Sequence, residues 1–136
     1  MQGLALDNLE ENLYLSDYIK GLYRYHIASG ALTPLESDCD CTLSGIDGLY
    51  YYETRLIALH NGTNPKRVMI YQLDGDRVIG SEIIAQGGES LNEPTQGVIV
   101  DNEFYFIGNS PWTAYAEDGT FQTPDSKTKI FRYSLN

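Results

Sequence analysis

The sequence contains three copies of a six-residue pattern that places Tyr fourth and Ile or Leu sixth. The copies are LYRYHI at 22–27, VMIYQL at 68–73 and IFRYSL at 130–135. A Gly followed by an aliphatic residue opens each unit, at Gly3, Gly45 and Gly97. Short β-type segments that recur at roughly 40 to 50 residues are typical of stacked blades or solenoid turns. The chain is therefore expected to fold into similar units that cover one another.

Alternating apolar residues and turn signals predict four strands in the first unit, four in the second and three in the third. The expected strands are 3–7, 13–16, 21–27 and 31–35, then 45–52, 55–59, 67–73 and 77–85, and finally 97–100, 103–108 and 129–135. A repeated four-stranded antiparallel meander is the unit of a β-propeller. We predict an all-β protein with one half-propeller domain over 1–136. Its blades span approximately 3–36, 45–85 and 97–136, the last one incomplete.

Two segments resemble blades of known propellers. Glu93–Ser110 (EPTQGVIVDNEFYFIGNS) and Gly3–Tyr18 are similar to blades of bacterial six-bladed propellers, in the broad group of SMP-30/gluconolactonase, strictosidine-synthase-like and NHL-type proteins. The resemblance implies that this chain corresponds to the C-terminal half of such a propeller, with about three of six blades. A fold-level likeness does not fix the chemistry.

Three blades by themselves leave two apolar blade faces uncovered, and large exposed apolar faces mark association sites. We therefore expect a homo-oligomer, most simply a two-fold dimer that closes a six-bladed ring. Its interface should exceed the ~1,600 Å² of typical specific complexes. An open three-bladed wedge and a larger assembly are the alternatives.

Charge and hydropathy exclude two classes of partner. The formal net charge of −10 argues against nucleic acid, because the phosphates would be repelled. No apolar run approaches the ~20 residues that a membrane-spanning helix needs, so no membrane association is expected. The start, Met1-Gln2-Gly3, lacks the basic and apolar regions of a signal peptide. These features leave the localisation open.

Propeller connectivity places the longer connections on one face. The segments 17–20, 60–66, 109–127, 36–44 and 86–96 are expected to share it, and long loops on a rigid frame commonly carry function. We predict that this face binds any ligand, through residues chosen for their chemistry: Asp17, His60, Asn61, Asn109, Trp112 and Tyr115.

Asp17, Asn61 and Asn109 each follow the second strand of a unit. Their oxygens could converge on a divalent cation such as Ca²⁺, or they could cap turns at the strand ends. The resemblance also implies a divalent metal near the central channel, bound by Glu, Asn and Asp. In that family a ligand commonly precedes the Gly that opens a blade. Here those positions hold Gln2, Ser44 and Gln96, which are poor substitutes.

Cys39 and Cys41 flank Asp40. A disulfide between residues two apart is strained, and two thiolates with His60 could bind Zn²⁺. Two reduced thiols are the simplest expectation. His60 ends a strand on the loop-bearing face and is the best candidate for a general acid or base, whereas His26 is expected at an ordinary outward-facing strand position.

Trp112 and Tyr115 lie in the longest connection. Trp112 could stack on a flat ligand as part of a lid, or it could pack over a neighbouring blade.

Two functions follow from these features. The first is a propeller-forming binding or assembly module that oligomerises to complete a ring, its specific ligand unknown. The alternative, from the resemblance, is a metal-assisted lactone or ester hydrolase in which bound Ca²⁺ or Zn²⁺ polarises the carbonyl and activates water. A scaffold that binds other proteins through the loop-bearing face is a further alternative.

Overall fold

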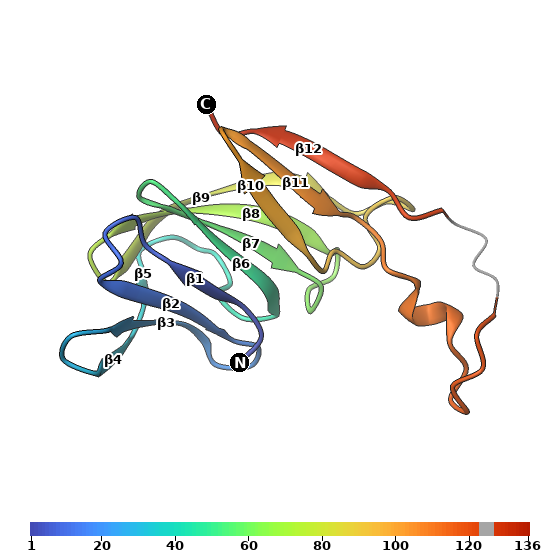
Figure 1. Ribbon diagram of the computed structural model, residues 1–136, viewed down its shortest axis with the longest axis horizontal. Coiled ribbons are helices and arrows are strands. Elements are labelled where there is room, and N and C mark those ends of the chain that lie inside the picture. Colours follow the sequence, from blue (N-terminus) through green and yellow to red (C-terminus); the bar gives the residue numbers. More distant parts are fainter. Residues whose placement is uncertain (123–126) are drawn as a thin grey trace.

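The computed structural model describes residues 1–122 and 127–136, apart from the side chain of Thr113, and they form three mainly antiparallel sheets (Figure 1). The first sheet contains β1 (Leu4–Leu6), β2 (Asn12–Asp17), β3 (Gly21–His26) and β4 (Ala31–Pro34). The second contains β6 (Ile46–Tyr52), β7 (Arg55–His60), β8 (Arg67–Asp74) and β9 (Arg77–Gln86), with the short β5 (Glu36–Ser37) at its edge. The third contains β10 (Gly97–Val100), β11 (Glu103–Ile107) and β12 (Ile130–Ser134).

The eleven strands expected from the sequence are all present, with ends that differ by a few residues. Each sheet is a meander of consecutive strands, and the third has three strands, as expected. Two elements were not foreseen. The strand β5 pairs in parallel with β9 and so joins the connection after the first sheet to the outer edge of the second. A 3₁₀ turn, η1 (Pro111–Ala114), follows β11.

The middle strands of the second sheet, β7 and the first half of β8, are buried on both sides, because their side chains alternate between two neighbouring sheets. Leu56, Ala58 and Tyr71 belong to a core shared with the first sheet. Their neighbours along the strands, Ile57 and Ile70, belong to a core shared with the third sheet. These five side chains are at most 3% exposed. The middle sheet is therefore the layer on which the two outer sheets pack.

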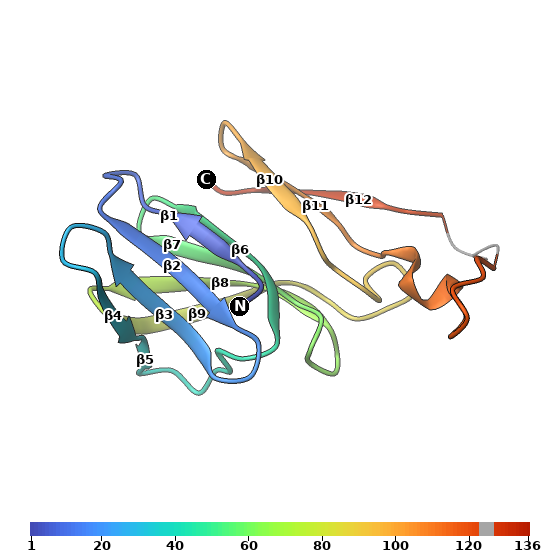
Figure 2. The ribbon, with the colours of Figure 1, turned by 60° about the horizontal axis from the view of Figure 1, so that its bottom comes forward.

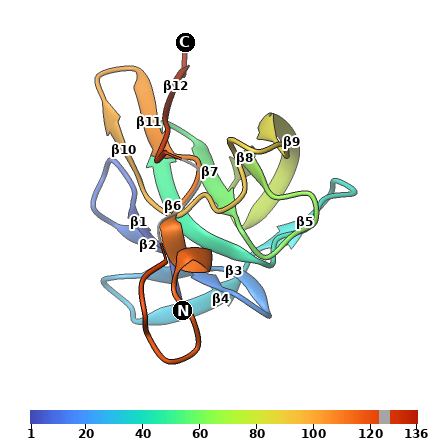
Figure 3. The ribbon, with the colours of Figure 1, turned by 90° about the vertical axis from the view of Figure 1, so that its right-hand side faces the viewer.

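The three sheets are arranged like a fan, with their first strands closest together (Figures 2 and 3). β6 contacts both β1 and β10, so the inner edges of the sheets meet. A tight approach at Gly3 supports this arrangement: a Cβ there would lie 2.7 Å from the Leu49 Cβ and 2.8 Å from the Leu49 backbone nitrogen. The repeated opening Gly at 45 has a different reason, a φ of +73°, which L side chains rarely adopt.

Polar contacts also join neighbouring sheets. The guanidinium Nε of Arg24 on β3 lies 2.7 Å from an Asp76 carboxylate oxygen in the β8–β9 turn. Between the second and third sheets, the Gly97 backbone N–H donates to the Tyr50 hydroxyl over 2.7 Å. These polar contacts therefore join the same pairs of sheets that the two apolar cores join. Among the residues that the structure describes, no helix has the length and apolarity that a membrane span requires.

Replacing Leu59 by Ala tests the role of the middle sheet. Leu59 is fully buried in the core shared with the third sheet. The cavity left by Leu59→Ala should lower the free energy of unfolding by about 2–5 kcal/mol, measured by urea denaturation at fixed protein concentration. Leu9, 75% exposed in the β1–β2 turn, is the matched control. Leu9→Ala should change stability by no more than about 0.5 kcal/mol, and equal effects of the two changes would contradict the packing described.

Candidate functional site

The first sheet turns an apolar side away from the second sheet. We call this side the N-terminal face. Its members are related by the register of β1 to β4 and by side-chain alternation, and they are Leu4, Leu6, Leu13, Leu15, Tyr23, Tyr25, Leu32 and Pro34. Leu4 and Leu32 are 60% and 51% exposed. The opposite side of the same strands, including Ala5 and Tyr14, is buried against the second sheet.

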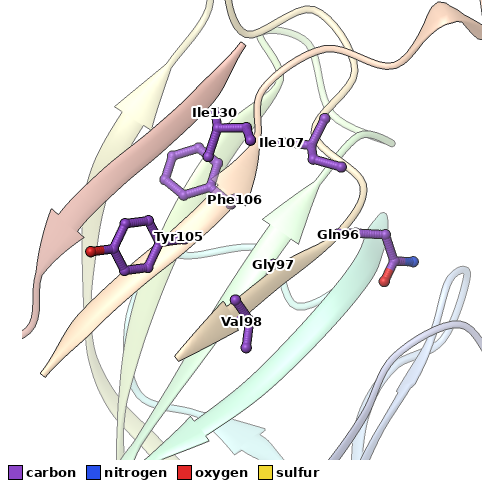
Figure 4. Close-up of a pocket in the computed structure, with 7 residues that line it drawn as sticks. All are labelled: Gln96, Gly97, Val98, Tyr105, Phe106, Ile107 and Ile130. Carbon is purple, nitrogen blue, oxygen red and sulfur yellow. The ribbon is translucent and has the colours of Figure 1, made fainter. Parts of the chain in front are cut away.

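The third sheet has a corresponding open side, the C-terminal face. Its apolar members are Val98, Val100, Tyr105, Ile107 and Ile130, and the register places Glu103, Arg132 and Ser134 on the same side. Ile130 is 72% exposed. Most of these apolar side chains line a shallow pocket of about 280 Å³ (Figure 4). The pocket therefore lies on a side of the sheet that no other described part of the chain covers.

A second hollow, of about 220 Å³, lies where the inner strands meet. It is lined by residues from β1, β6 and β10, including Leu6, Tyr51 and Ile99. The hollow is apolar, and it marks the side of the fan on which the three sheets converge.

The connections expected to share one face do lie next to one another. The Gly45 N–H donates to the Tyr18 carbonyl oxygen over 2.7 Å, and the Gly62 N–H donates to the Gly45 carbonyl oxygen over 3.1 Å. On the other side of the second sheet, Lys66 and Glu93 form an ion pair. With the contact between His60 and the Ser44 carbonyl oxygen, these contacts bring together the connections 17–20, 36–44, 60–66 and 86–96 or the residues next to them. The Glu93 N–H also donates to the carbonyl oxygen of Gly108, the residue before 109–127.

Asp17 caps its own turn, whereas Asn61 and Asn109 form hydrogen bonds with more distant segments. Asp17 accepts the backbone N–H groups of Ile19 and Lys20, and these bonds lower the pKa of its carboxyl group. Asn109, which is buried, accepts the Lys129 N–H over 2.8 Å. Within residues 1–122 and 127–136, no group of three or more His, Cys, Asp or Glu side chains could hold a metal ion.

Asn61 takes part in a hydrogen-bonded chain that the sequence did not reveal. It accepts the Tyr18 hydroxyl over 2.9 Å and donates to the Asp47 carboxylate over 2.9 Å. Asp47 is the extra residue of a β-bulge between Ile46 and Gly48, at the start of inner strand β6. Burial raises the pKa of the Asp47 carboxyl group. An acidic residue inside an otherwise apolar strand was the available signal, because bulges re-aim side chains.

The metal site implied by the resemblance does not fit the residues present. Gln2 and Gln96 are exposed, and the Ser44 hydroxyl pairs with the Thr42 hydroxyl over 3.1 Å. None of these groups is a carboxylate, and hard divalent cations bind chiefly through carboxylates. The positions that would supply the family's ligands therefore offer neutral oxygens already engaged elsewhere or facing solvent.

His60 is fully buried rather than presented on the loop-bearing face. The imidazole Nδ1 lies 3.1 Å from the Ser44 carbonyl oxygen and Nε2 lies 2.8 Å from the Tyr71 hydroxyl, which donates to the Thr42 carbonyl oxygen over 2.5 Å. Burial, with a smaller effect of the nearby Arg67 charge, lowers the pKa of His60 to about 4. The side chain thus fastens the incoming 42–44 connection to the second sheet. His26, by contrast, is half-buried on β3 and lies 2.8 Å from the Ser29 hydroxyl.

The expectation of reduced thiols at Cys39 and Cys41 was wrong, because the structure joins them in a disulfide. The Cys41 N–H donates to the Cys39 carbonyl oxygen over 2.9 Å, which folds the segment sharply. The two Cα atoms are consequently 5.3 Å apart, within the usual range for a disulfide. A zinc site formed by two thiolates and His60 is incompatible with this bond and with the buried position of His60.

Trp112 and Tyr115 lie in a segment that leaves the end of β11 and extends away from the three sheets (Figure 1). Trp112 is 69% exposed. Its ring contacts Tyr115, which in turn contacts Phe121, with centroids 6.4 and 5.1 Å apart. The aromatic side chains pack on each other rather than over a neighbouring sheet. Residues 123–126 of the expected 109–127 connection lie outside the described residues.

Comparison with known proteins gives a fold but no family. No protein-family model matches this sequence, and no curated protein sequence matches it. Among solved structures, the chain is similar to the PQQ-bound form of an aldose sugar dehydrogenase from Streptomyces coelicolor, with a TM-score of 0.57 and 12% identity. The match covers 96% of this chain and 42% of that one, so this chain spans less than half of the other's length. That protein is a β-propeller, and the all-β propeller fold expected from the sequence is confirmed.

The buried His60 predicts a specific pH dependence of stability. An unfolded imidazole has a pKa of about 6.5, so below that pH the unfolded chain takes up a proton before the folded chain does. Stability should therefore fall as the pH drops from about 6.5 to about 4, by about 3 kcal/mol from this group. Imidazole NMR shifts should show His60 neutral until pH 4 is approached.

Two variants separate this contribution from that of the carboxylates. His60→Gln should be less stable at pH 7 but should lose less stability than the parent between pH 6.5 and 4. His26→Gln should retain the full loss. A His60 signal that titrates near pH 6.5 would contradict the buried neutral imidazole.

Proposed function

We propose that this chain is an assembly module whose two open sheet faces pack on the blades of a second copy and so complete a propeller. The observation that carries the proposal is the presence of two apolar faces at opposite ends of one stack of sheets. Inside the stack, the same kind of side chains cover one another and are almost fully buried. If the outer sides of the first and third sheets stayed uncovered, they would expose continuous apolar surface, which is unusual for a monomeric protein.

The distribution of charge supports this proposal. The chain carries 19 acidic and 9 basic residues, yet the eight members of the N-terminal face include none of them, and the nearest acidic residue on that side is Asp17 at the end of β2. The C-terminal face contains one charged residue of each sign, Glu103 and Arg132, which lie 3.6 Å apart and offset each other. Charged groups are depleted at the centres of protein interfaces. The two faces therefore carry fewer charged residues than the rest of this acidic surface, as the centres of protein interfaces do.

Coverage of the structural neighbour supports a second copy as the occupant. This chain accounts for 42% of the length of that propeller, so two copies together would supply most of a chain of that size. The hydrolase alternative lacks comparable support, because the described residues offer no acidic cluster for a metal and His60 is enclosed. A propeller that closes from two chains accounts for both faces at once.

Solution mass tests the proposal. The parent protein should sediment at about twice its 15.2 kDa chain mass at micromolar concentration. A charge buried in the contact costs several kcal/mol, so Val98→Glu and Leu4→Glu, one on each face, should both shift the protein to a monomer. Multi-angle light scattering across a dilution series measures the change.

Ile19→Glu is the matched control, because Ile19 is 85% exposed in the β2–β3 turn and outside both faces. It should leave the mass of the assembly unchanged, and circular dichroism should show that all three variants remain folded. A parent protein that stays monomeric at these concentrations would refute the proposal.

A further inference from the structure

We infer that two copies join head to tail, so that Tyr105 on the C-terminal face of one copy packs on Leu6 in the N-terminal face of the other. This inference rests on the assembly proposed above and specifies its geometry. It follows from the contacts that the three sheets already make with one another.

The sheets can be superposed through their registers. In the second strand of each sheet, Leu13, Leu56 and Phe104 occupy one position, since each pairs with the repeated Tyr of the third strand: Tyr25, Tyr71 and Tyr133. Tyr71 packs toward the first sheet and Tyr133 packs toward the second. The repeated Tyr therefore always faces the preceding sheet. Tyr25 has the same orientation, and no described part of this chain precedes its sheet.

The residue that follows in the second strand faces the other way, toward the next sheet. These residues are Tyr14, Ile57 and Tyr105. Tyr14 stacks on Tyr51 of the second sheet, with centroids 5.5 Å apart and planes inclined by 9°. Ile57 and Ile99 belong to the same core between the second and third sheets. Tyr105 has no such neighbour in the described chain and lines the pocket of Figure 4.

The residues that receive these contacts are also equivalent. Tyr51 pairs with Leu56, and Ile99 pairs with Phe104, in the first strands of their sheets. In the first sheet, the residue that pairs with Leu13 is Leu6, which is 43% exposed. The chain thus makes one type of contact twice, between the first and second sheets and between the second and third sheets. The C-terminal face offers one side of a further such contact, and the N-terminal face offers the other side. A head-to-tail union repeats it, whereas joining two C-terminal faces would not.

Photo-crosslinking identifies the residue that Tyr105 contacts. Tyr105 is replaced by p-benzoyl-phenylalanine, which keeps an aromatic ring, and labelled and unlabelled copies are mixed so that links between chains can be recognised. After tryptic digestion, Tyr105 should be linked to the peptide 1–20 of the other copy. The same replacement at Tyr115, which is exposed outside both faces, should give no link to that peptide.

Each other result has a defined meaning. Links from Tyr105 to peptide 78–127 of the other copy, or an assembled protein with no link from Tyr105, would overturn the head-to-tail geometry while leaving the assembly itself intact. A monomeric mass before irradiation would instead refute the assembly. The two failures are therefore distinguishable.

A binding measurement gives an independent check. A closed ring of two copies contains the Tyr105–Leu6 contact twice. Loss of a central aromatic contact typically weakens an interface roughly tenfold or more, so Tyr105→Ala and Leu6→Ala should each raise the dimer dissociation constant about 100-fold. Leu9→Ala, outside both faces, should leave the constant unchanged. Equal constants for the parent and the first two variants would overturn the inference.

Discussion

The burial of the middle strands of the second sheet on both of their sides is the constraint on which the rest of the structure depends. Strands with apolar residues on both faces, such as β7 with Leu56 and Ile57, have no side that can face water. They require a sheet above and a sheet below. The first and third sheets meet this requirement, and in doing so each directs its own outer side away from the stack. The two open faces are the direct consequence of satisfying the middle sheet.

The sequence was sufficient to predict the strands because each depends on local alternation and on turns that the chain itself encodes. Leu13, Tyr14 and Leu15 alternate between an open and a buried side, and the structure follows that pattern. The three strands of the third sheet were predicted from the same kinds of signal. Open faces could be expected from the number of strands. Which residues occupy equivalent positions in the three sheets could be identified only from the strand pairing in the structure.

The chemistry of the loop-bearing face could not be predicted in the same way. His60 was a reasonable candidate acid or base by position, but its environment depends on Tyr71 and on the carbonyl group of Ser44, which come from distant segments. The disulfide between Cys39 and Cys41 depends on a sharp local turn rather than on spacing alone. The role of Asp47 depends on a bulge. The bulge shifts the strand register by one residue, so the alternation of side chains in the sequence does not reveal it.

The proposed assembly would also decide where a ligand could bind. The inner strands β1, β6 and β10 converge beside an apolar hollow, and Asp47 with its Asn61 partner lies at the start of the middle one. In a single chain this side of the fan is open, so water competes with every polar contact made there. In a ring closed by two copies, the same strands would surround an axis, and each polar group would act in a more enclosed, lower-dielectric space where electrostatic contacts are stronger. Ring closure is therefore the step that would turn these inner edges into a binding site, and any ligand specificity would depend on it.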